Sequence, residues 1–134
     1  MKPKIAFICI GNSCRSQMAE GFAKKYVCDY FDIFSAGTEP AETVNPLAIS
    51  VMKEKNIDIS NQKTKPLKDI PVFINYIITM GCGVSCPFIP HDYQEDWELD
   101  DPVGRPIEEF RKTRDLIENK LNDFLLRFKN NNFT

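Results

Sequence analysis

The chain has 134 residues and a formal net charge of −2, with Lys, Arg, Asp and Glu mixed along its length. This length is typical of one domain with a single core. The sequence has no basic patch for nucleic acid, no acidic block typical of disorder and no apolar run long enough to span a bilayer. The N-terminus also lacks a long apolar signal segment, so we expect a cytoplasmic protein. We further expect a monomer that binds neither nucleic acid nor membrane.

The most informative segment is the turn between a predicted strand at 5–8 and a predicted helix at 17–25. In such a turn the backbone N–H groups and the positive end of the helix dipole converge on one point, which suits a tetrahedral oxyanion. Arg15 adds a forked cation that can hold two of its oxygens. The predicted oxyanion-binding residues are Ile10, Gly11, Asn12, Ser13, Cys14 and Arg15.

Cys9 begins this turn, where the positive field favours a thiolate. A thiolate that faces a bound oxyanion is placed to attack phosphorus or arsenic. The alternative is a buried Cys9 at a strand end with Arg15 on the surface. Gly11, Asn12 and Ser13 favour the first interpretation, because they suit a tight loop that exposes its own N–H groups. The position also fits, since open α/β sheets bind ligands beyond the carboxyl ends of their strands.

Strands and helices continue to alternate after this turn. The pattern predicts strands at 31–35 and 76–80, helices at 46–55 and 106–129, and a helical turn at 66–70. Asn45 is the expected N-cap of the second helix. Residues 81–106 are predicted to be irregular, with a short strand near Trp97. Alternating elements predict parallel βαβ units, so we expect an α/β fold: one domain over 1–129, a doubly wound sheet of about four parallel strands with helices on both faces, and a frayed tail at 130–134.

Cys82 and Cys86 follow the third predicted strand, on the sheet edge where Cys9 is expected. In a helical segment their Cα atoms would lie about 6 Å apart, within the range of a disulfide. The pair is therefore a candidate redox pair beside the nucleophile. Two alternatives are open: zinc binding together with His91 and a fourth ligand that is either Asp92 or a distant residue, or inert packing thiols. His91 is the only histidine and is expected on a surface loop.

Asp100 and Asp101 precede Pro102 just before the last helix. An acid on this loop could protonate an oxygen that leaves the oxyanion. The alternative is a turn or capping residue. The Asp-Pro step favours Asp101 as the acid.

Together these residues resemble the arsenate reductases that share the low-molecular-weight protein tyrosine phosphatase fold. The matching segments run in order along nearly the whole chain: 9–20, 35–38, 45–46, 57–60 and 96–102. The resemblance implies that Cys9 attacks arsenate held by the loop amides and Arg15, that Ser16 hydrogen-bonds the thiolate, and that Asp101 protonates the leaving oxygen.

The resemblance also implies a thiol relay. Cys82 would attack the Cys9 sulfur and release arsenite, and Cys86 would then attack Cys82 and free Cys9. No tightly bound cofactor is expected. The external reductant would be a thioredoxin-like protein or a glutathione–glutaredoxin system. Only three residues separate Cys82 from Cys86, fewer than is usual in the thioredoxin-coupled branch, which leaves the reductant and the role of Cys86 open.

The chain departs from the resemblance at Lys65. Some of these enzymes bind potassium through residues that resemble Asn12, Glu20 and Ser35, together with an aspartate at about this point. Here the Lys65 ammonium either neutralises Glu20 without a metal or is a solvated surface group. We therefore predict no metal site.

Among the remaining residues, Cys14 is expected to have no catalytic role and Cys28 to be a packing residue. Phosphatases of this fold usually carry a tyrosine where this chain has Val103. The predicted function is reduction of arsenate to arsenite. The alternative is a phosphatase acting on phosphotyrosine or aryl phosphates through Cys9, Arg15 and Asp101, and a non-catalytic oxyanion-binding module comes third.

Overall fold

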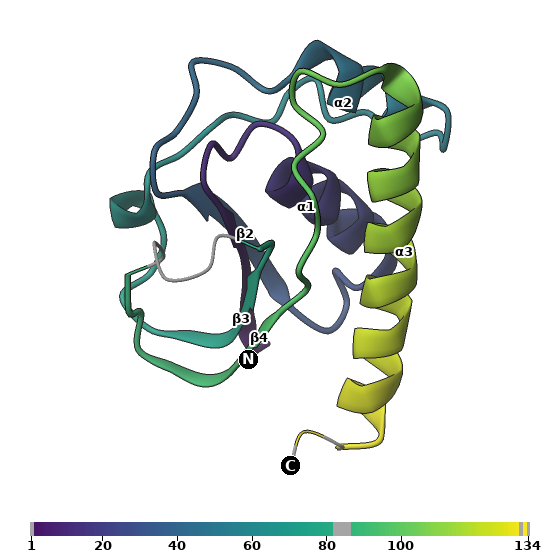
Figure 1. Cartoon of the computed structure of the whole chain (residues 1–134). Helices are drawn as coiled ribbons and strands as arrows, with labels where there is room; N and C mark the ends of the chain where they lie inside the picture. Colours follow the sequence, from purple (N-terminus) through teal and green to yellow (C-terminus); the bar gives the residue numbers. More distant parts are fainter. Residues whose placement is uncertain (1, 82–86, 132, 134) are drawn as a thin grey trace.

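The computed structural model, which describes residues 2–81, 87–131 and 133, is built on one parallel sheet with the strand order β2-β1-β3-β4 (Figure 1). The strands are β1 (Lys4–Cys9), β2 (Asp32–Gly37), β3 (Ile74–Thr79) and β4 (His91–Asp96). The helices are α1 (Arg15–Tyr26), α2 (Pro46–Lys53), α3 (Ile107–Lys129) and the 3₁₀ turn η1 (Leu67–Asp69). The predicted α/β fold class, with four parallel strands, is confirmed.

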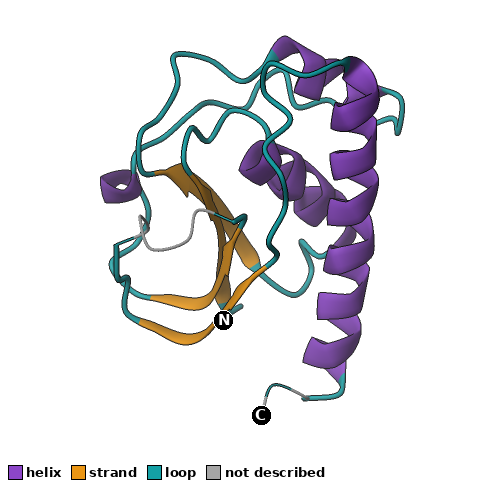
Figure 2. Cartoon of the chain, viewed as in Figure 1, coloured by secondary structure: helices purple, strands orange, loops and turns teal. Residues whose placement is uncertain are grey.

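The two faces of the sheet are covered unequally (Figure 2). One face carries Ile5, Phe7 and Ile78 and packs against the buried sides of α1, α2 and α3. The opposite face carries Ile8 and Ile77 and is covered by η1 and by the chain around Ile89. The β3–β4 connection, residues 80–90, is too short for the long crossover helix that usually joins parallel strands. Among the described residues, the second face therefore has a thinner cover than the first.

β1 is one of the two inner strands of the sheet, and the loops of interest leave at one edge of the sheet. Cys9 ends β1 beside Gly37 of β2, and Ile8 lies beside Thr79 of β3. The Met80 N–H donates to the Ile8 carbonyl at 3.0 Å. Because all these strands are parallel, the segments that follow β1, β2 and β3 leave the sheet at the same edge. Both chain termini lie at the opposite end of the molecule (Figure 1).

The start of α2 confirms the predicted cap. The Asn45 side chain accepts a hydrogen bond from the Leu47 N–H at 2.8 Å, and Pro46 is the first helical residue. The Asn45 N–H in turn donates to the Ser13 carbonyl at 2.8 Å. The cap therefore also fixes the helix against the turn that follows β1.

Three sequence expectations need correction. His91 lies at the start of a six-residue strand, β4, not on a surface loop, and its Nδ1 is 2.6 Å from the Ile89 carbonyl oxygen. Cys28 is exposed, because it lies in the turn after α1 and not in the core. In the expected frayed tail, Phe133 packs on the domain, with its ring centroid 4.7 Å from that of Tyr93 and 5.1 Å from that of Phe124.

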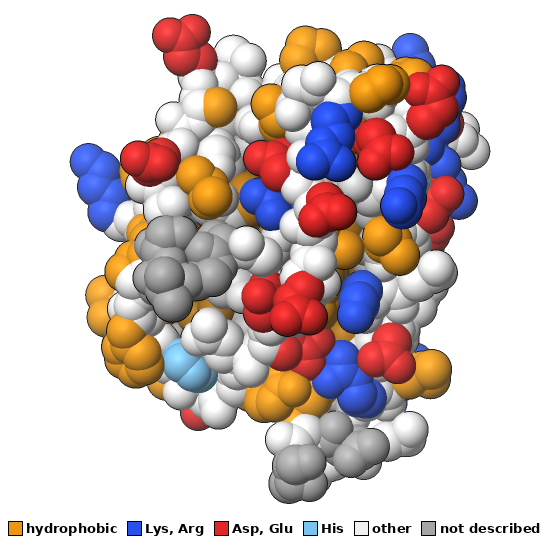
Figure 3. All heavy atoms as spheres, in the orientation of Figure 1, with side chains coloured by type: hydrophobic (Ala, Val, Ile, Leu, Met, Phe, Trp, Pro, Cys, Tyr) orange, Lys and Arg blue, Asp and Glu red, His pale blue; other side chains and the backbone are white. Residues whose placement is uncertain are grey.

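Charged side chains of both signs are interspersed over α3 (Figure 3). Several of them tie α2 to α3. Glu54, at the end of α2, accepts hydrogen bonds from Arg111 at 2.9 Å and from Arg114 at 2.6 Å. Arg114 also donates to the Val51 carbonyl at 2.9 Å. No helix in the described ranges is long and apolar enough to cross a membrane.

The Glu54 cluster predicts a pH-dependent contribution to stability. Hydrogen bonds from Arg111 and then Arg114 lower the pKa of Glu54 from 4.5 to about 2. A carboxylate with a lowered folded-state pKa stabilises the fold above its unfolded pKa, and this contribution is lost as the pH falls through the folded value. Glu54→Gln should therefore lower the urea midpoint at pH 7, and the difference from wild type should shrink between pH 4.5 and pH 2.

The exposed Glu42, changed to Gln, serves as the control and should leave the midpoint unchanged at every pH. A Glu54→Gln difference that is as large near pH 2 as at pH 7 would contradict the assigned ion pairs.

Candidate active site

Cys9 lies at the end of β1 with its sulfur enclosed by the turn that follows. Its side chain is 2% exposed. The Sγ atom is 2.8 Å from the Ser16 Oγ and accepts a hydrogen bond from the Asn12 N–H at 3.1 Å. Both groups can donate a hydrogen bond to the sulfur. The structure thus brings together Cys9 and Ser16, which the sequence predicted as neighbours in function.

Asn12 organises the turn from inside. It has a positive φ of 50° and is fully buried. Its Nδ2 donates to the Ser16 Oγ at 2.7 Å and to the Ser35 Oγ at 3.1 Å. Its Oδ1 accepts from the Gln17 Nε2 and from the Lys65 N–H, each at 2.9 Å. Asn is among the few residues other than Gly that tolerate this backbone conformation, and here the side-chain bonds hold it there.

Gly37, the last residue of β2, supports the turn from the side. A Cβ atom at this position would lie 2.5 Å from the Ile10 carbonyl oxygen and 2.9 Å from the Asn12 nitrogen. Only glycine allows the strand and the turn to approach so closely. The segment 35–38, which the sequence matched to the family, therefore has a packing reason at Gly37.

Arg15, the first residue of α1, joins three loops. Its side chain is 5% exposed. The Nη1 atom donates to the Met80 carbonyl and, at 2.9 Å, to the Leu99 carbonyl. The Nη2 atom lies 3.8 Å from Oδ2 of Asp101. Arg15 thus holds the chain after β3 and the chain after β4 against the turn, and it presents Nη2 on the side of Asp101.

Asp101 lies in a turn, and one of its carboxylate oxygens faces Arg15. Its Oδ1 accepts the Val103 N–H at 3.1 Å, which is a turn of the kind that aspartate side chains stabilise. Its Oδ2 faces Arg15, and the side chain is half exposed. The turn fixes one carboxylate oxygen and leaves the other directed at the site. Protonation by Asp101 is therefore compatible with a turn at this position.

Glu20 is a buried carboxylate that two lysines neutralise. It accepts a hydrogen bond from the Ser35 Oγ and lies 2.6 Å from the Lys24 Nζ and 3.4 Å from the Lys65 Nζ. The Lys65 Nζ also donates to the Lys63 carbonyl at 2.7 Å. Because two ammonium groups already supply positive charge, the residues present do not fit a potassium ion. Of the two sequence interpretations of Lys65, the contact with Glu20 favours charge neutralisation.

Cys14 is buried beside the site, but its thiol is not suited to act as a nucleophile. Burial raises the pKa of its thiol from 9.0 to about 12, and the charges of Asp101 and Cys9 act in the same direction. The thiol therefore stays protonated at neutral pH, so it is a poor nucleophile. This agrees with the expectation that Cys14 contributes only its backbone to the turn.

The predicted redox pair, Cys82 and Cys86, lies outside the described residues, and so does the zinc alternative that depends on it. Within the described part of the chain, no group of three or more His, Cys, Asp or Glu side chains could hold a metal ion. Two contact residues were not predicted. Gln17 donates to Asn12 and to the Lys63 carbonyl, and Asp96 accepts from the Gly81 N–H at 2.6 Å. A polar Gln17 on the buried side of α1 was the only available signal.

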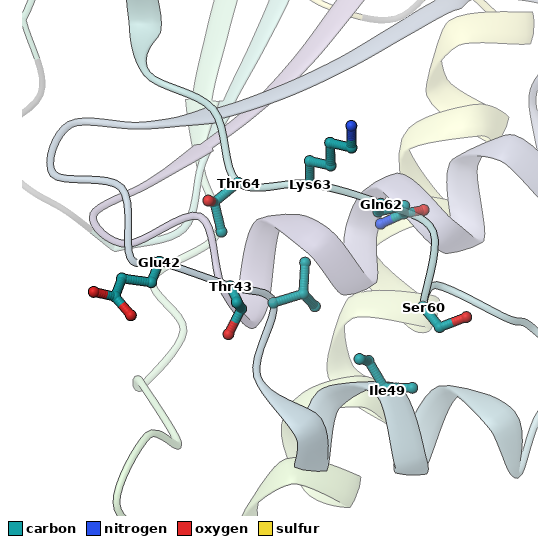
Figure 4. Close-up of a pocket in the computed structure, with 8 residues that line it drawn as sticks. Glu42, Thr43, Ile49, Ser60, Gln62, Lys63 and Thr64 are labelled. Carbon is teal, nitrogen blue, oxygen red and sulfur yellow. The ribbon is translucent and has the colours of Figure 1, made fainter.

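A separate surface cavity of about 360 Å³ lies between the segments 42–49 and 60–64 (Figure 4). Gln62 lines this cavity and also donates to Gln17 at 2.7 Å. Because Gln17 donates to Asn12, one wall of the cavity is linked by hydrogen bonds to the turn that holds Cys9. The lining includes none of Cys9, Arg15 and Asp101, and Glu42 and Lys63 point away from each other. The cavity is therefore distinct from the Cys9 site.

Comparisons with known proteins agree with this geometry. Residues 4–133 match the family model described as low molecular weight phosphotyrosine protein phosphatase. An arsenate reductase of Staphylococcus aureus (strain Newman) is 45% identical over 131 residues, which cover 94% of this chain and 98% of that protein.

Two solved structures extend the comparison. An arsenate reductase in the phosphate binding state has a TM-score of 0.84 at 38% identity and covers 95% of this chain and 98% of its own. A thioredoxin-dependent arsenate reductase of Corynebacterium glutamicum has a TM-score of 0.72 at 32% identity, covering 93% of this chain and 63% of its own. The chain therefore belongs to the low molecular weight phosphotyrosine protein phosphatase family, in the group of sequences that includes the staphylococcal arsenate reductases.

Proposed function

We propose that this protein reduces arsenate to arsenite, with Cys9 as the nucleophile. The observation that carries the proposal is the Cys9 sulfur itself, 2.8 Å from the Ser16 hydroxyl and 3.1 Å from the Asn12 N–H at the amino end of α1. Its near full-length similarity to arsenate reductases favours arsenate as the substrate. Arsenate is a tetrahedral oxyanion of the kind that a helix N-terminus binds.

In the first step, the Cys9 thiolate attacks arsenic while the turn amides and Arg15 hold the oxygens. An As–S bond forms and an As–O bond breaks, and Asp101 supplies the proton that lets this oxygen leave as water. The position of Asp101, 3.8 Å from Arg15 across the site, supports this role. Desolvation of the buried sulfur strengthens each of these electrostatic interactions.

In the second step, the Cys82 thiolate attacks the Cys9 sulfur. The new S–S bond replaces the As–S bond, whose electron pair stays on arsenic, so arsenic is reduced while the two thiols are oxidised. Cys86 then attacks Cys82 and frees Cys9. A thioredoxin-like protein or a glutathione–glutaredoxin system would reduce the resulting disulfide. The thioredoxin-dependent neighbour supports the first of these reductants.

A phosphatase is the second candidate, because the family match and the same three side chains would serve phosphate ester hydrolysis. Val103 follows the Asp-Pro step and is about half exposed, where phosphatases of this fold usually carry tyrosine. The deciding experiment compares arsenate-dependent NADPH oxidation, with a thioredoxin and with a glutaredoxin system, against hydrolysis of an aryl phosphate. Cys9→Ser should abolish every activity found. Aryl phosphatase activity without arsenate reduction would reject the proposal.

The proposed acid predicts a rate effect without a binding effect. General acids typically contribute about 10²–10⁴-fold, so Asp101→Asn should lower the rate of arsenate reduction within that range. Inhibition by inorganic phosphate should change little, because the turn amides and Arg15 are intact. Asp100→Asn is the matched control and should have a much smaller effect. Equal and small effects of both changes would mean that this loop is only a turn.

The proposed relay predicts where each cysteine variant stops. Cys86→Ser should reduce about one equivalent of arsenate and stall with a Cys9–Cys82 disulfide. Peptide mapping under non-reducing conditions would identify that bond, whereas wild type should carry Cys82–Cys86. Cys82→Ser should stop multiple turnover and leave any aryl phosphate hydrolysis intact. Normal cycling of both variants with a glutaredoxin system would remove the pair from the mechanism.

The pairing of Lys65 with Glu20 predicts indifference to potassium. Exchange of potassium for sodium at fixed ionic strength should leave the rate of arsenate reduction unchanged, because Lys24 and Lys65 already neutralise the carboxylate. Lys65→Met should lower the rate, whereas Lys63→Met should not, since only the Lys63 backbone contacts this network. A specific stimulation of wild type by potassium would contradict this assignment.

A further inference from the structure

A glutamine that the proposed reaction does not use supports the turn at Cys9. Gln17 lies in the first turn of α1, two residues after Arg15, and it is fully buried. A buried side-chain amide has to place its N–H groups and its oxygen on partners inside the protein, because an unpaired polar group is costly there. The partners of Gln17 therefore show what this residue holds in place.

The nitrogen of the Gln17 amide holds one residue of the turn at two points. The Nε2 atom donates to the Asn12 backbone carbonyl at 3.0 Å and to the Asn12 Oδ1 at 2.9 Å. A third contact, to the Lys63 carbonyl at 2.9 Å, ties the same amide to the segment after α2. Asn12 has a positive φ of 50°, and its N–H donates to the Cys9 sulfur at 3.1 Å. Gln17 thus fixes both the backbone and the side chain of the residue that directs an N–H at the nucleophile.

Gln62 determines which way the Gln17 amide faces. It lies on the loop between α2 and η1 (Figure 4). Its Nε2 donates to the Gln17 Oε1 at 2.7 Å and to the Gln17 backbone carbonyl at 3.0 Å. A reversed Gln17 amide would point its oxygen at three other oxygens and its N–H groups at those of Gln62. The donor end of Gln17 is therefore held on Asn12 by a residue that is 45 positions away in the sequence.

We propose that Gln17 is a positioning residue of the oxyanion site, which holds Asn12 in the conformation that the turn needs, and that Gln62 acts on the site through Gln17. The inference deepens the proposed function and rests on it only in taking the turn after β1 as the site of a tetrahedral oxyanion. The hydrogen bonds described for the Gln17 side chain go to neither Cys9 nor Arg15. Gln17 therefore acts through Asn12 and is not a catalytic residue.

The first measurement tests the contacts without reference to any activity. Gln62→Met keeps a side chain of similar length and removes the donor that orients Gln17. The side-chain amide protons of Gln17, followed by NMR, should then exchange with water at least about tenfold faster. Gln94→Met is the matched control, because Gln94 is the remaining glutamine of the chain and is exposed on β4. It should leave the exchange at Gln17 unchanged.

The second measurement tests the consequence at the site, as the Kd of inorganic phosphate by calorimetry. Gln17→Met frees Asn12 at two points, so it should raise this Kd at least about fivefold. Gln62→Met should raise it about threefold, but it should add nothing in the Gln17→Met background, because both changes act through the same amide. Gln94→Met should bind phosphate as wild type does.

The double variant separates positioning from a general loss of stability, since independent effects on stability would add. If Gln17→Met fails to fold by circular dichroism, Gln62→Met carries the test, because Gln62 is half-buried and lines a surface cavity. Unchanged exchange at Gln17 in Gln62→Met would overturn the contact. Phosphate binding at the wild-type Kd in either variant would overturn the positioning role, and equal effects of Gln62→Met in both backgrounds would overturn the route through Gln17.

The outcomes also separate this inference from the proposed function. A protein that shows these losses of phosphate affinity but does not reduce arsenate would overturn the proposed function and leave the role of Gln17 standing. A protein that reduces arsenate while Gln17→Met binds phosphate as wild type does would overturn only the inference. Wild type that binds no phosphate would overturn both, because the turn would then not be an oxyanion site.

Discussion

The structure depends on one buried side-chain amide. An asparagine side chain can donate two hydrogen bonds and accept two, and Asn12 uses all four, to Ser16, Ser35, Gln17 and the Lys65 N–H. A buried polar group left unpaired costs about 1–3 kcal/mol, so each lost partner would loosen the turn. This saturation holds the backbone of Asn12 at its positive φ, and that backbone directs its N–H at the Cys9 sulfur.

The bonds made by Asn12 continue outward to charged groups. Ser35 receives the Asn12 amide and donates to Glu20, and Glu20 ends the series on Lys24 and Lys65. A nearly buried carboxylate needs compensating positive charge, because desolvation penalises its ionised form. The lysines are therefore part of the support of the turn although they lie away from Cys9. This hydrogen-bond network joins Asn12, Glu20 and Lys65 through Ser35, which lies on β2. The turn around Cys9 therefore depends on the folded sheet and not on its own sequence alone.

The sequence was sufficient where the determinants are contiguous. The segment 9–16 contains the strand end, the turn and the helix start, so local geometry predicted a turn with Cys9 and Arg15 at its two ends, whereas the contact of Ser16 with Cys9 was implied by the family resemblance. The short strand predicted near Trp97 is β4, but the sequence did not give its bounds, because its residues are polar and at most half buried and an edge strand of this kind has little apolar pattern. The hydrogen bonds of Gln17 and Asp96 were missed for another reason: each joins segments that are distant in sequence, and no residue pattern reports such a contact.

The contacts of Arg15 are compatible with both candidate reactions, arsenate reduction and phosphate ester hydrolysis. Its guanidinium spans the loops after β1, β3 and β4, with Nη1 on the Met80 and Leu99 carbonyls and Nη2 toward Asp101. A lysine could not replace it, because an ammonium lacks the planar fork that reaches partners on two sides. Phosphate ester hydrolysis would need only the side of Arg15 that faces Asp101. The other side holds the Met80 and Leu99 carbonyls and so joins the chain after β3 to the chain after β4. The arrangement around Arg15 is therefore compatible with the proposed arsenate reduction and with phosphate ester hydrolysis.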